Sequence, residues 1–202
     1  MAGTKEWTFN NIINTIKMEK VIEVKFEDVK RAFDEASDSA KKSILTLFPQ
    51  LKEIFLITYR VKTFEDACHE IGIDPEQYMS KYEGEPADVI AYMKLRVICK
   101  ALNEGWMPQF AWSEERWCPW FLLWTEEELS DKDDKWKINQ HLIPTNGYLG
   151  DFASFGNPGS SHAPFGARLD VSSCLYLKSS ELADYCGKQF IDLWADFYLT
   201  KK

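Results

Sequence analysis

The stretch Trp117-Cys-Pro-Trp-Phe-Leu-Leu-Trp124 decides how the second half of this chain folds. It carries no charged residue and is rich in aromatic side chains, which is typical of a β-strand. Side chains alternate along a strand, so Trp117 and Phe121 would share one face. Trp120 and Trp124 would then share the other. Because both faces carry aromatic rings, the strand is either buried on both sides or keeps one aromatic face for a partner.

Tryptophan is concentrated here, since five of the eight tryptophans fall within residues 106–124. Three interpretations are open: the rings build a core, form a patch that meets another protein, or stack on single-stranded nucleic acid. The third would use Arg116, Lys135 and Lys137 for the phosphates. Over residues 113–137, however, acidic residues outnumber basic ones two to one. A protein partner is therefore favoured, and the candidate contact residues are Trp112, Trp117, Trp120, Phe121 and Trp124.

The residues around and after the strand predict further elements. Pro119 indicates an edge position or a bulge, because proline cannot donate a ladder hydrogen bond. Thr125-Glu-Glu-Glu128 has the spacing of a capping box and should open a short helix. Residues 136–143 are interpreted as a second strand, and residues 144–166 as a long loop rich in Gly, Pro, Ser and Asn. That loop is either an ordinary connection over the sheet or a second interaction surface, with candidates Phe152, Phe155 and Phe165.

The end of the chain predicts a strand followed by a helix. Apolar and polar residues alternate over much of 168–177, which indicates a half-buried strand. Ser179 or Ser180 then caps a helix that runs to about Leu199. Gly187 inside this helix costs about 1 kcal/mol relative to alanine and indicates a close approach to the sheet. The expected buried face of the helix comprises Leu182, Cys186, Phe190, Leu193 and Phe197.

The first half of the chain is helical in pattern, with helices expected at 26–33, 38–48, 63–71 and 87–104. Thr63 is a natural N-cap followed by acidic residues, and Gly105 lies where a left-handed C-terminal cap is needed. The fold class is therefore α+β. Residues 1–84 form a helical N-terminal region. Residues 85–202 form an α+β unit in which a small antiparallel or mixed sheet packs against a long C-terminal helix.

Composition limits the classes of function. The 202 residues carry a net charge of −8, which disfavours a protein that binds duplex DNA through its phosphates. The chain has no run of about 18 apolar residues, so no membrane-spanning helix is expected. Its N-terminus lacks the apolar stretch of a secretory signal. The five scattered cysteines are odd in number and form no CxxC pair, which indicates reduced thiols inside a cell.

Several segments in a fixed order resemble a family of uncharacterised proteins of gut Bacteroidetes phages and prophages. The resemblance covers roughly residues 20–200. The segments are Lys62-Thr-Phe-Glu-Asp-Ala-Cys68, Ile71-Gly-Ile-Asp-Pro75, Lys100-Ala-Leu-Asn-Glu-Gly-Trp106, Pro119-Trp-Phe121, Arg168-Leu169 and Leu182-Ala-Asp-Tyr-Cys-Gly-Lys-Gln-Phe190. The resemblance implies a phage origin and a place in the host cytoplasm or in a virion. It implies no established activity and no catalytic residue.

The residues themselves predict no catalytic, cofactor or metal site. Zinc ligands usually come in closely spaced pairs, and only Cys68-His69 are adjacent here. Cys118, His141 and Asp151 could be combined into a nucleophilic triad, but no local signature supports it, and a packed Cys118 thiol is favoured. The segment 144–166 is rich in glycine, but it contains no lysine and no phosphate-binding motif. The acidic runs are interpreted as solvated faces.

We therefore expect a non-catalytic, phage-derived accessory protein that acts through protein–protein interaction or self-assembly. It would be a virion component or a host-interaction factor. The alternative is a single-stranded nucleic-acid-binding protein of phage replication. An enzyme with a site near Cys118 or His141 is a third, less favoured, class.

Overall fold

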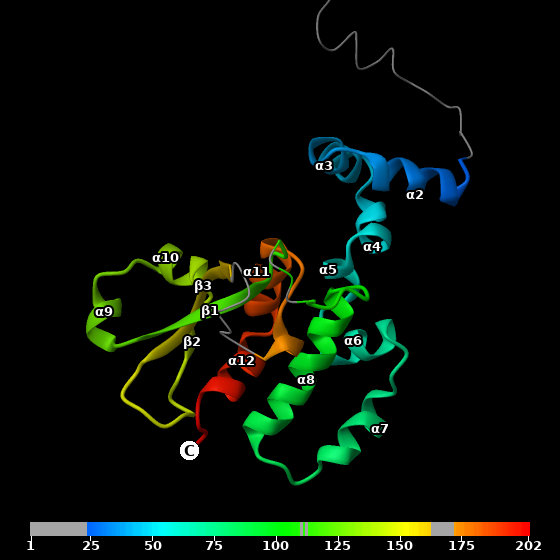
Figure 1. Cartoon of the computed structure of the whole chain (residues 1–202). Coiled ribbons are helices and arrows are strands. Elements are labelled where there is room, and N and C mark those ends of the chain that lie inside the picture. The colour runs from blue at the N-terminus through cyan, green and yellow to red at the C-terminus, as the bar shows by residue number, and fades with distance from the viewer. Residues whose placement is uncertain (1–23, 110, 112, 163–171) are drawn as a thin grey trace, which may run out of the picture. The chain divides into compact units, whose positions relative to one another are not determined.

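Figure 1 shows the computed structural model of the chain, which describes residues 24–109, 111, 113–162 and 172–202. The α+β class expected from the sequence is confirmed. The chain divides into two compact units, Met1–Pro49 and Gln50–Lys202, which are described separately below. The boundary expected near Gly84 falls inside the second unit, because the helices that begin at Phe64 and Ala87 pack on each other there.

The first unit contains two described helices, α2 (Phe26–Glu35) and α3 (Asp38–Leu47). The Ser37 hydroxyl caps α3 by accepting a hydrogen bond from the Ala40 N–H at 3.3 Å. Phe33 and Leu45 are the buried apolar residues of the pair. Both helices lie where the sequence predicts them.

The second unit begins with its helices, which are α4 (Lys52–Phe55), α5 (Ile57–Arg60), α6 (Phe64–Glu70), α7 (Pro75–Met79), the 3₁₀ turn η2 (Ser80–Tyr82) and α8 (Ala87–Leu102). The turn η1 (Pro49–Leu51) precedes them. Thr63 caps α6 in a full capping box, in which its hydroxyl accepts from the Asp66 N–H and the Asp66 carboxylate accepts from the Thr63 N–H. Gly105 has a φ of 89°, the left-handed conformation expected after α8.

The second unit continues with a three-stranded antiparallel sheet in the order β1-β3-β2, formed by β1 (Trp117–Trp124), β2 (Ile143–Pro144) and β3 (Ser154–His162). β1 is an edge strand, as Pro119 predicts. Two residues of β3, Asn157 and Pro158, lie opposite the single residue Phe121 of β1, so β3 carries a β-bulge.

Two predictions for the segment after β1 are wrong. Residues 136–143 were expected to be a strand, but the first four belong to α10 (Asp134–Asn139), which the Asp133 side chain caps, and only Ile143 lies in a strand. The segment 144–166 was expected to be a loop, but it contains the central strand β3. β3 is rich in Gly, Ser and Pro and has no alternating pattern, so its pairing with two neighbours decides its conformation. The capping box at Thr125 is confirmed and opens α9 (Glu126–Ser130).

The end of the chain forms a 3₁₀ turn and two helices, η3 (Ser173–Leu175), α11 (Ser180–Gln189) and α12 (Ile191–Tyr198). The strand expected over 168–177 is wrong for its described part, where only Leu177 makes a single bridge, to Trp117. Residues 163–171 lie outside the described residues. The long C-terminal helix expected from the sequence is broken at Phe190. In the helix after the break Trp194 is buried in the core, whereas Leu193 is only partly buried.

The core of the second unit lies between α8, the sheet and the two C-terminal helices (Figure 1). Trp194 is fully buried at its centre, together with Leu95, Ile98 and Leu102 from α8. α8 packs against α12 on one side and α6 on the other. No helix within the described ranges is both long enough and apolar enough to span a membrane.

Gly187 lets α11 approach the sheet closely, as the sequence predicts. A Cβ atom at this position would lie 2.6 Å from the Asn157 Nδ2 atom and 2.7 Å from the Pro119 Cβ atom. The Asn157 amide is itself held there, because it donates to the Trp120 carbonyl at 2.8 Å and to the Gly159 carbonyl at 2.9 Å. These two hydrogen bonds connect the bulge residue Asn157 to β1 and to the next part of β3.

The substitution Gly187→Ala should lower the free energy of unfolding by about 1–2 kcal/mol, because overpacking outweighs the gain in helix propensity. Urea unfolding followed by circular dichroism would measure it. Gly147→Ala is the control, since a Cβ at Gly147 meets no atom within 4 Å, and it should change stability little. A Gly187→Ala variant as stable as the wild type would contradict the close approach.

Candidate functional site

The tryptophan-rich strand β1 has one paired edge and one outer edge. The inner edge pairs with β3 along its length. On the outer edge the Trp117 N–H donates to the Leu177 carbonyl at 3.0 Å, and the Leu177 N–H donates to the Trp117 carbonyl at 2.8 Å. Beyond Trp117, no other described strand pairs with this edge. Backbone N–H and C=O groups of residues two apart in a strand point to the same edge. Pro119 therefore points to the same outer edge as Trp117, and this edge has no N–H donor at Pro119.

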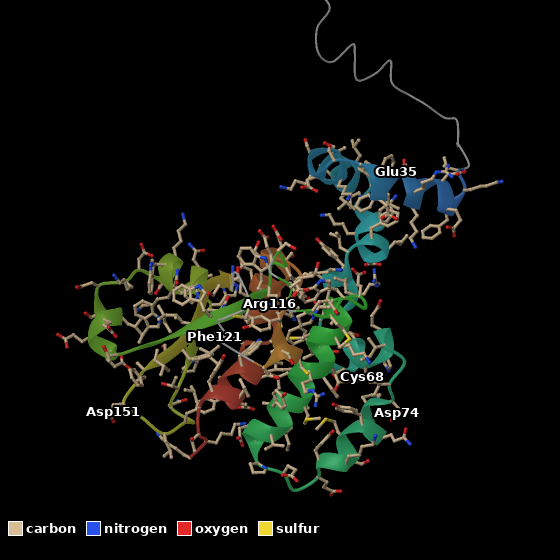
Figure 2. The ribbon with its side chains drawn as sticks, viewed as in Figure 1. Glu35, Cys68, Asp74, Arg116, Phe121 and Asp151 are labelled. Carbon is tan, nitrogen blue, oxygen red and sulfur yellow. The ribbon has the colours of Figure 1, made fainter. Side chains whose placement is uncertain are left out.

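One face of β1 builds the core. The Phe121 ring lies where β1 meets α12, with its centroid 4.8 Å from that of Phe155 and 5.3 Å from that of Trp194 (Figure 2). Trp117 and Leu123 also pack against the core. Trp117 and Phe121 therefore share a face, as the alternation predicts, and that face is covered by the protein itself.

The other pair of rings is only half covered. Trp124 is partly buried because the Trp136 ring of α10 packs edge-on against it, at 5.2 Å between centroids. Trp120 is 41% exposed. A Cβ at Gly159 would lie 3.3 Å from the Trp120 Nε1 atom, so the indole is seated against the backbone of β3. Trp120 is thus an exposed ring that a neighbouring strand holds in place.

A groove of about 500 Å³ follows β1 beside Trp120. Consecutive residues of β1 line it, together with Phe155 and Ser161 of β3. Tyr198, which is 47% exposed, and Leu199 close it from the end of α12. We call it the β1 groove, and its lining residues are Cys118, Pro119, Trp120, Phe121, Leu122, Leu123, Phe155, Ser161, Tyr198 and Leu199.

The β1 groove contains no charged residue among the described residues that line it. In a chain of which 28% is charged, about three charged residues would be expected among ten. Its chemistry therefore suits an apolar segment rather than a polyanion.

Phe152 and Phe155, two of the residues predicted for a second interaction surface, differ in exposure. Phe155 is 2% exposed and belongs to the core, because it lies on the central strand and not on a loop. Phe152 is 45% exposed, next to the start of β3. Trp112 and Phe165 lie outside the described residues.

The cation nearest β1 is not available to a nucleic acid. Arg116 is fully buried, 3.8 Å from the Glu114 carboxylate and with its guanidinium 5.6 Å from the centroid of the Tyr176 ring (Figure 2). Of the three cations predicted to contact phosphates, this leaves Lys135 and Lys137 on α10. This arrangement weakens the nucleic-acid alternative, because ring stacking without a positive track binds single strands poorly.

Cys118, His141 and Asp151, the three residues considered for a nucleophilic triad, have different surroundings. The buried Cys118 thiol donates to the Ser161 carbonyl at 3.9 Å. The His141 Nδ1 atom lies 3.2 Å from the carbonyl of Asn139, and Asp151 is exposed. Among the residues that the structure describes, no three His, Cys, Asp or Glu side chains come together as a metal site.

The cysteines differ sharply in exposure, since four are buried and Cys174 is exposed. Burial, and after it the charge of Glu65, raises the pKa of Cys68 to about 11. A hydrogen bond with Cys186 and burial raise the pKa of Cys99 well above the usual thiol value. Thiols with raised pKa values stay protonated near neutral pH and are poor nucleophiles.

Sequence reasoning missed Tyr198, Leu199 and Gly159 as parts of the site. The four-residue spacing of Trp194 and Tyr198 was the available signal, since such residues are neighbours on a helix. Their rings stack with centroids 6.0 Å apart.

In the native state at neutral pH, iodoacetamide should modify Cys174 and leave the other four cysteines unmodified over the same time. Peptide mass spectrometry before and after unfolding would measure this. Rapid modification of Cys118 in the native protein would instead support an activated nucleophile beside the β1 groove.

Comparison with known proteins gives the site no precedent. No protein-family model matches the chain, and neither a curated protein nor a solved structure matches it.

Proposed function

We propose that this protein is a non-catalytic binding protein that holds an apolar segment of another protein in the β1 groove. As part of the same proposal, and from the resemblance to phage proteins, it is a virion component or a host-interaction factor. The observation that carries the proposal is the exposed Trp120 ring, seated on β3 beside a groove whose described lining residues carry no charge.

The energetics favour Trp120 as the anchor of such a contact. Tryptophan is enriched among the few interface residues that dominate binding, each worth about 2 kcal/mol or more. Its position against Gly159 means that little side-chain freedom remains to be lost on binding. Tyr198 supplies a second exposed ring across the groove.

The partner is expected to bind mainly through its side chains. Addition of a full strand to β1 would need an uninterrupted row of backbone donors and acceptors. Pro119 interrupts the donors, and Leu177 already occupies the edge at Trp117. A short apolar segment with aromatic or branched side chains fits these limits.

A library of random linear peptides displayed on phage and selected on this protein should yield sequences rich in aromatic and branched aliphatic residues. Trp120→Ser should weaken their binding by about tenfold or more, as the loss of a hot spot implies. Fluorescence anisotropy with the selected peptides would measure the Kd. The control is Ile138→Ser, which removes a more exposed apolar side chain, 72% exposed on α10, outside the groove. Equal binding by wild type and Trp120→Ser would refute the proposal.

Single-stranded DNA provides the test of the alternative function. Titration with oligo-dT at low salt should leave the tryptophan fluorescence unchanged at micromolar DNA, because the described lining of the β1 groove contains no cation and Arg116 is buried. Saturable quenching that disappears in Trp120→Ser would establish base stacking on this ring and overturn the assignment to a protein partner.

A further inference from the structure

A second cavity lies in the helical part of the second unit, apart from the β1 groove. It has a volume of about 620 Å³, which is within the usual range of small-molecule sites. Residues from α7, η2, α8, the turn after α8 and η3 surround it. We call it the α8 pocket, and its lining includes Tyr78, Tyr82, Arg96, Lys100, Trp106 and Cys174.

The charges around the α8 pocket have one sign. Arg96 and Lys100 are one helical turn apart on α8, and both are exposed. No carboxylate is among the described residues that line the pocket, although the chain has 32 acidic and 24 basic residues. Within the described residues, neither cation lies within 4.0 Å of a carboxylate oxygen. The charged residues in the described lining of the pocket are therefore all basic, on an acidic protein.

Apart from Arg96 and Lys100, the described residues that line the α8 pocket are uncharged, and three of them are aromatic. The rings of Tyr78 and Tyr82 lie 5.5 Å apart between centroids. Burial, and after it the proximity of Tyr82, raises the pKa of Tyr78 to about 12, so its phenol stays neutral and donates to the Met93 carbonyl at 3.4 Å. Trp106 forms a further half-buried aromatic wall.

The one side-chain amide that lines the pocket, among the described residues, is not available to recognise a nucleobase. The Asn103 side chain already donates to the Tyr176 carbonyl at 2.8 Å and accepts from the Lys178 N–H at 3.0 Å. Its amide is thus used within the protein, whereas base recognition needs free donors and acceptors. What remains is an apolar, aromatic body for the pocket and an anionic head for the two cations.

We propose that the α8 pocket binds a small aromatic carboxylate, with its ring between the tyrosines and Trp106 and its carboxylate at Arg96 and Lys100. Arginine suits this role because its planar fork matches a carboxylate. The inference does not rest on the β1 groove or on its protein partner.

Isothermal titration calorimetry with 2-naphthoate tests the proposal on the full chain. Its neutral analogue 2-naphthalenemethanol should bind about tenfold more weakly, because it keeps the ring and loses the charge-assisted hydrogen bonds. Arg96→Gln and Lys100→Gln should each weaken 2-naphthoate by about fivefold to tenfold and leave the neutral analogue unaffected. Both residues are exposed, so the variants should keep the wild-type Tm.

Lys94→Gln is the matched control. It removes the same charge from the same helix, but Lys94 faces the Phe64 ring at 5.3 Å and does not line the pocket. Binding of 2-naphthoate should be unchanged in this variant. Equal binding of the acid and the neutral analogue, or equal weakening by all three substitutions, would overturn the proposal.

The exposed Cys174 thiol provides an independent readout of location. Because Cys174 lines the α8 pocket, saturating 2-naphthoate should slow its alkylation by iodoacetamide severalfold. Binding of 2-naphthoate without protection of Cys174 would place the ligand elsewhere and would also overturn the proposal.

Discussion

The second unit depends on the contact in which Gly187 of α11 meets Asn157 and Pro119 of the sheet. The missing side chain at Gly187 admits the Asn157 amide, and that amide bonds the carbonyls of Trp120 and Gly159. Buried N–H groups are costly unless they are hydrogen-bonded, so the two bonds donated by Asn157 Nδ2 link the helix position to the bulge and the strand pairing. Trp120 and Phe121 point to opposite faces of β1 because side chains alternate along a strand, and Phe121 lies on the face that packs against the core.

The parts of the fold that were predicted correctly rest on local chemistry. Thr63 and Thr125 cap helices through neighbours three residues away, and Gly105 ends α8 through its own backbone conformation. β3 could not be predicted in this way. Its Gly-, Pro- and Ser-rich sequence resembles a loop, and it is a strand because β1 and β2 supply partners on both sides.

The candidate site was predictable to a similar degree. Alternation along β1 separated Trp120 and Trp124 from the rings that enter the core. Alternation could not show that Trp124 is the more covered of the two rings. The ring that covers it, Trp136, lies on α10, a segment whose sequence pattern had predicted a strand. Tyr198 reaches the groove from the far end of the chain, and no local pattern reports such a tertiary contact.

The distribution of charge separates the two cavities. Several cations of the second unit are held in ion pairs: Arg60 with Glu70 and Glu104, Lys178 with Glu104, and Lys201 with Asp196. Lys100 and Arg96 differ in lining a pocket, and the Arg96 guanidinium lies 5.7 Å from the centroid of the Tyr92 ring. The β1 groove has no described charge in its lining, so one acidic chain presents two surfaces of unlike chemistry.

Pro119 also bears on how the protein behaves at high concentration. An apolar strand at the edge of a sheet is ordinarily a template on which a second copy can extend the sheet, which is a route to aggregation. Here the outer edge has no donor at Pro119, and the chain already bridges it at Trp117. The strand can thus keep an exposed tryptophan while it hinders edge-to-edge growth between identical molecules.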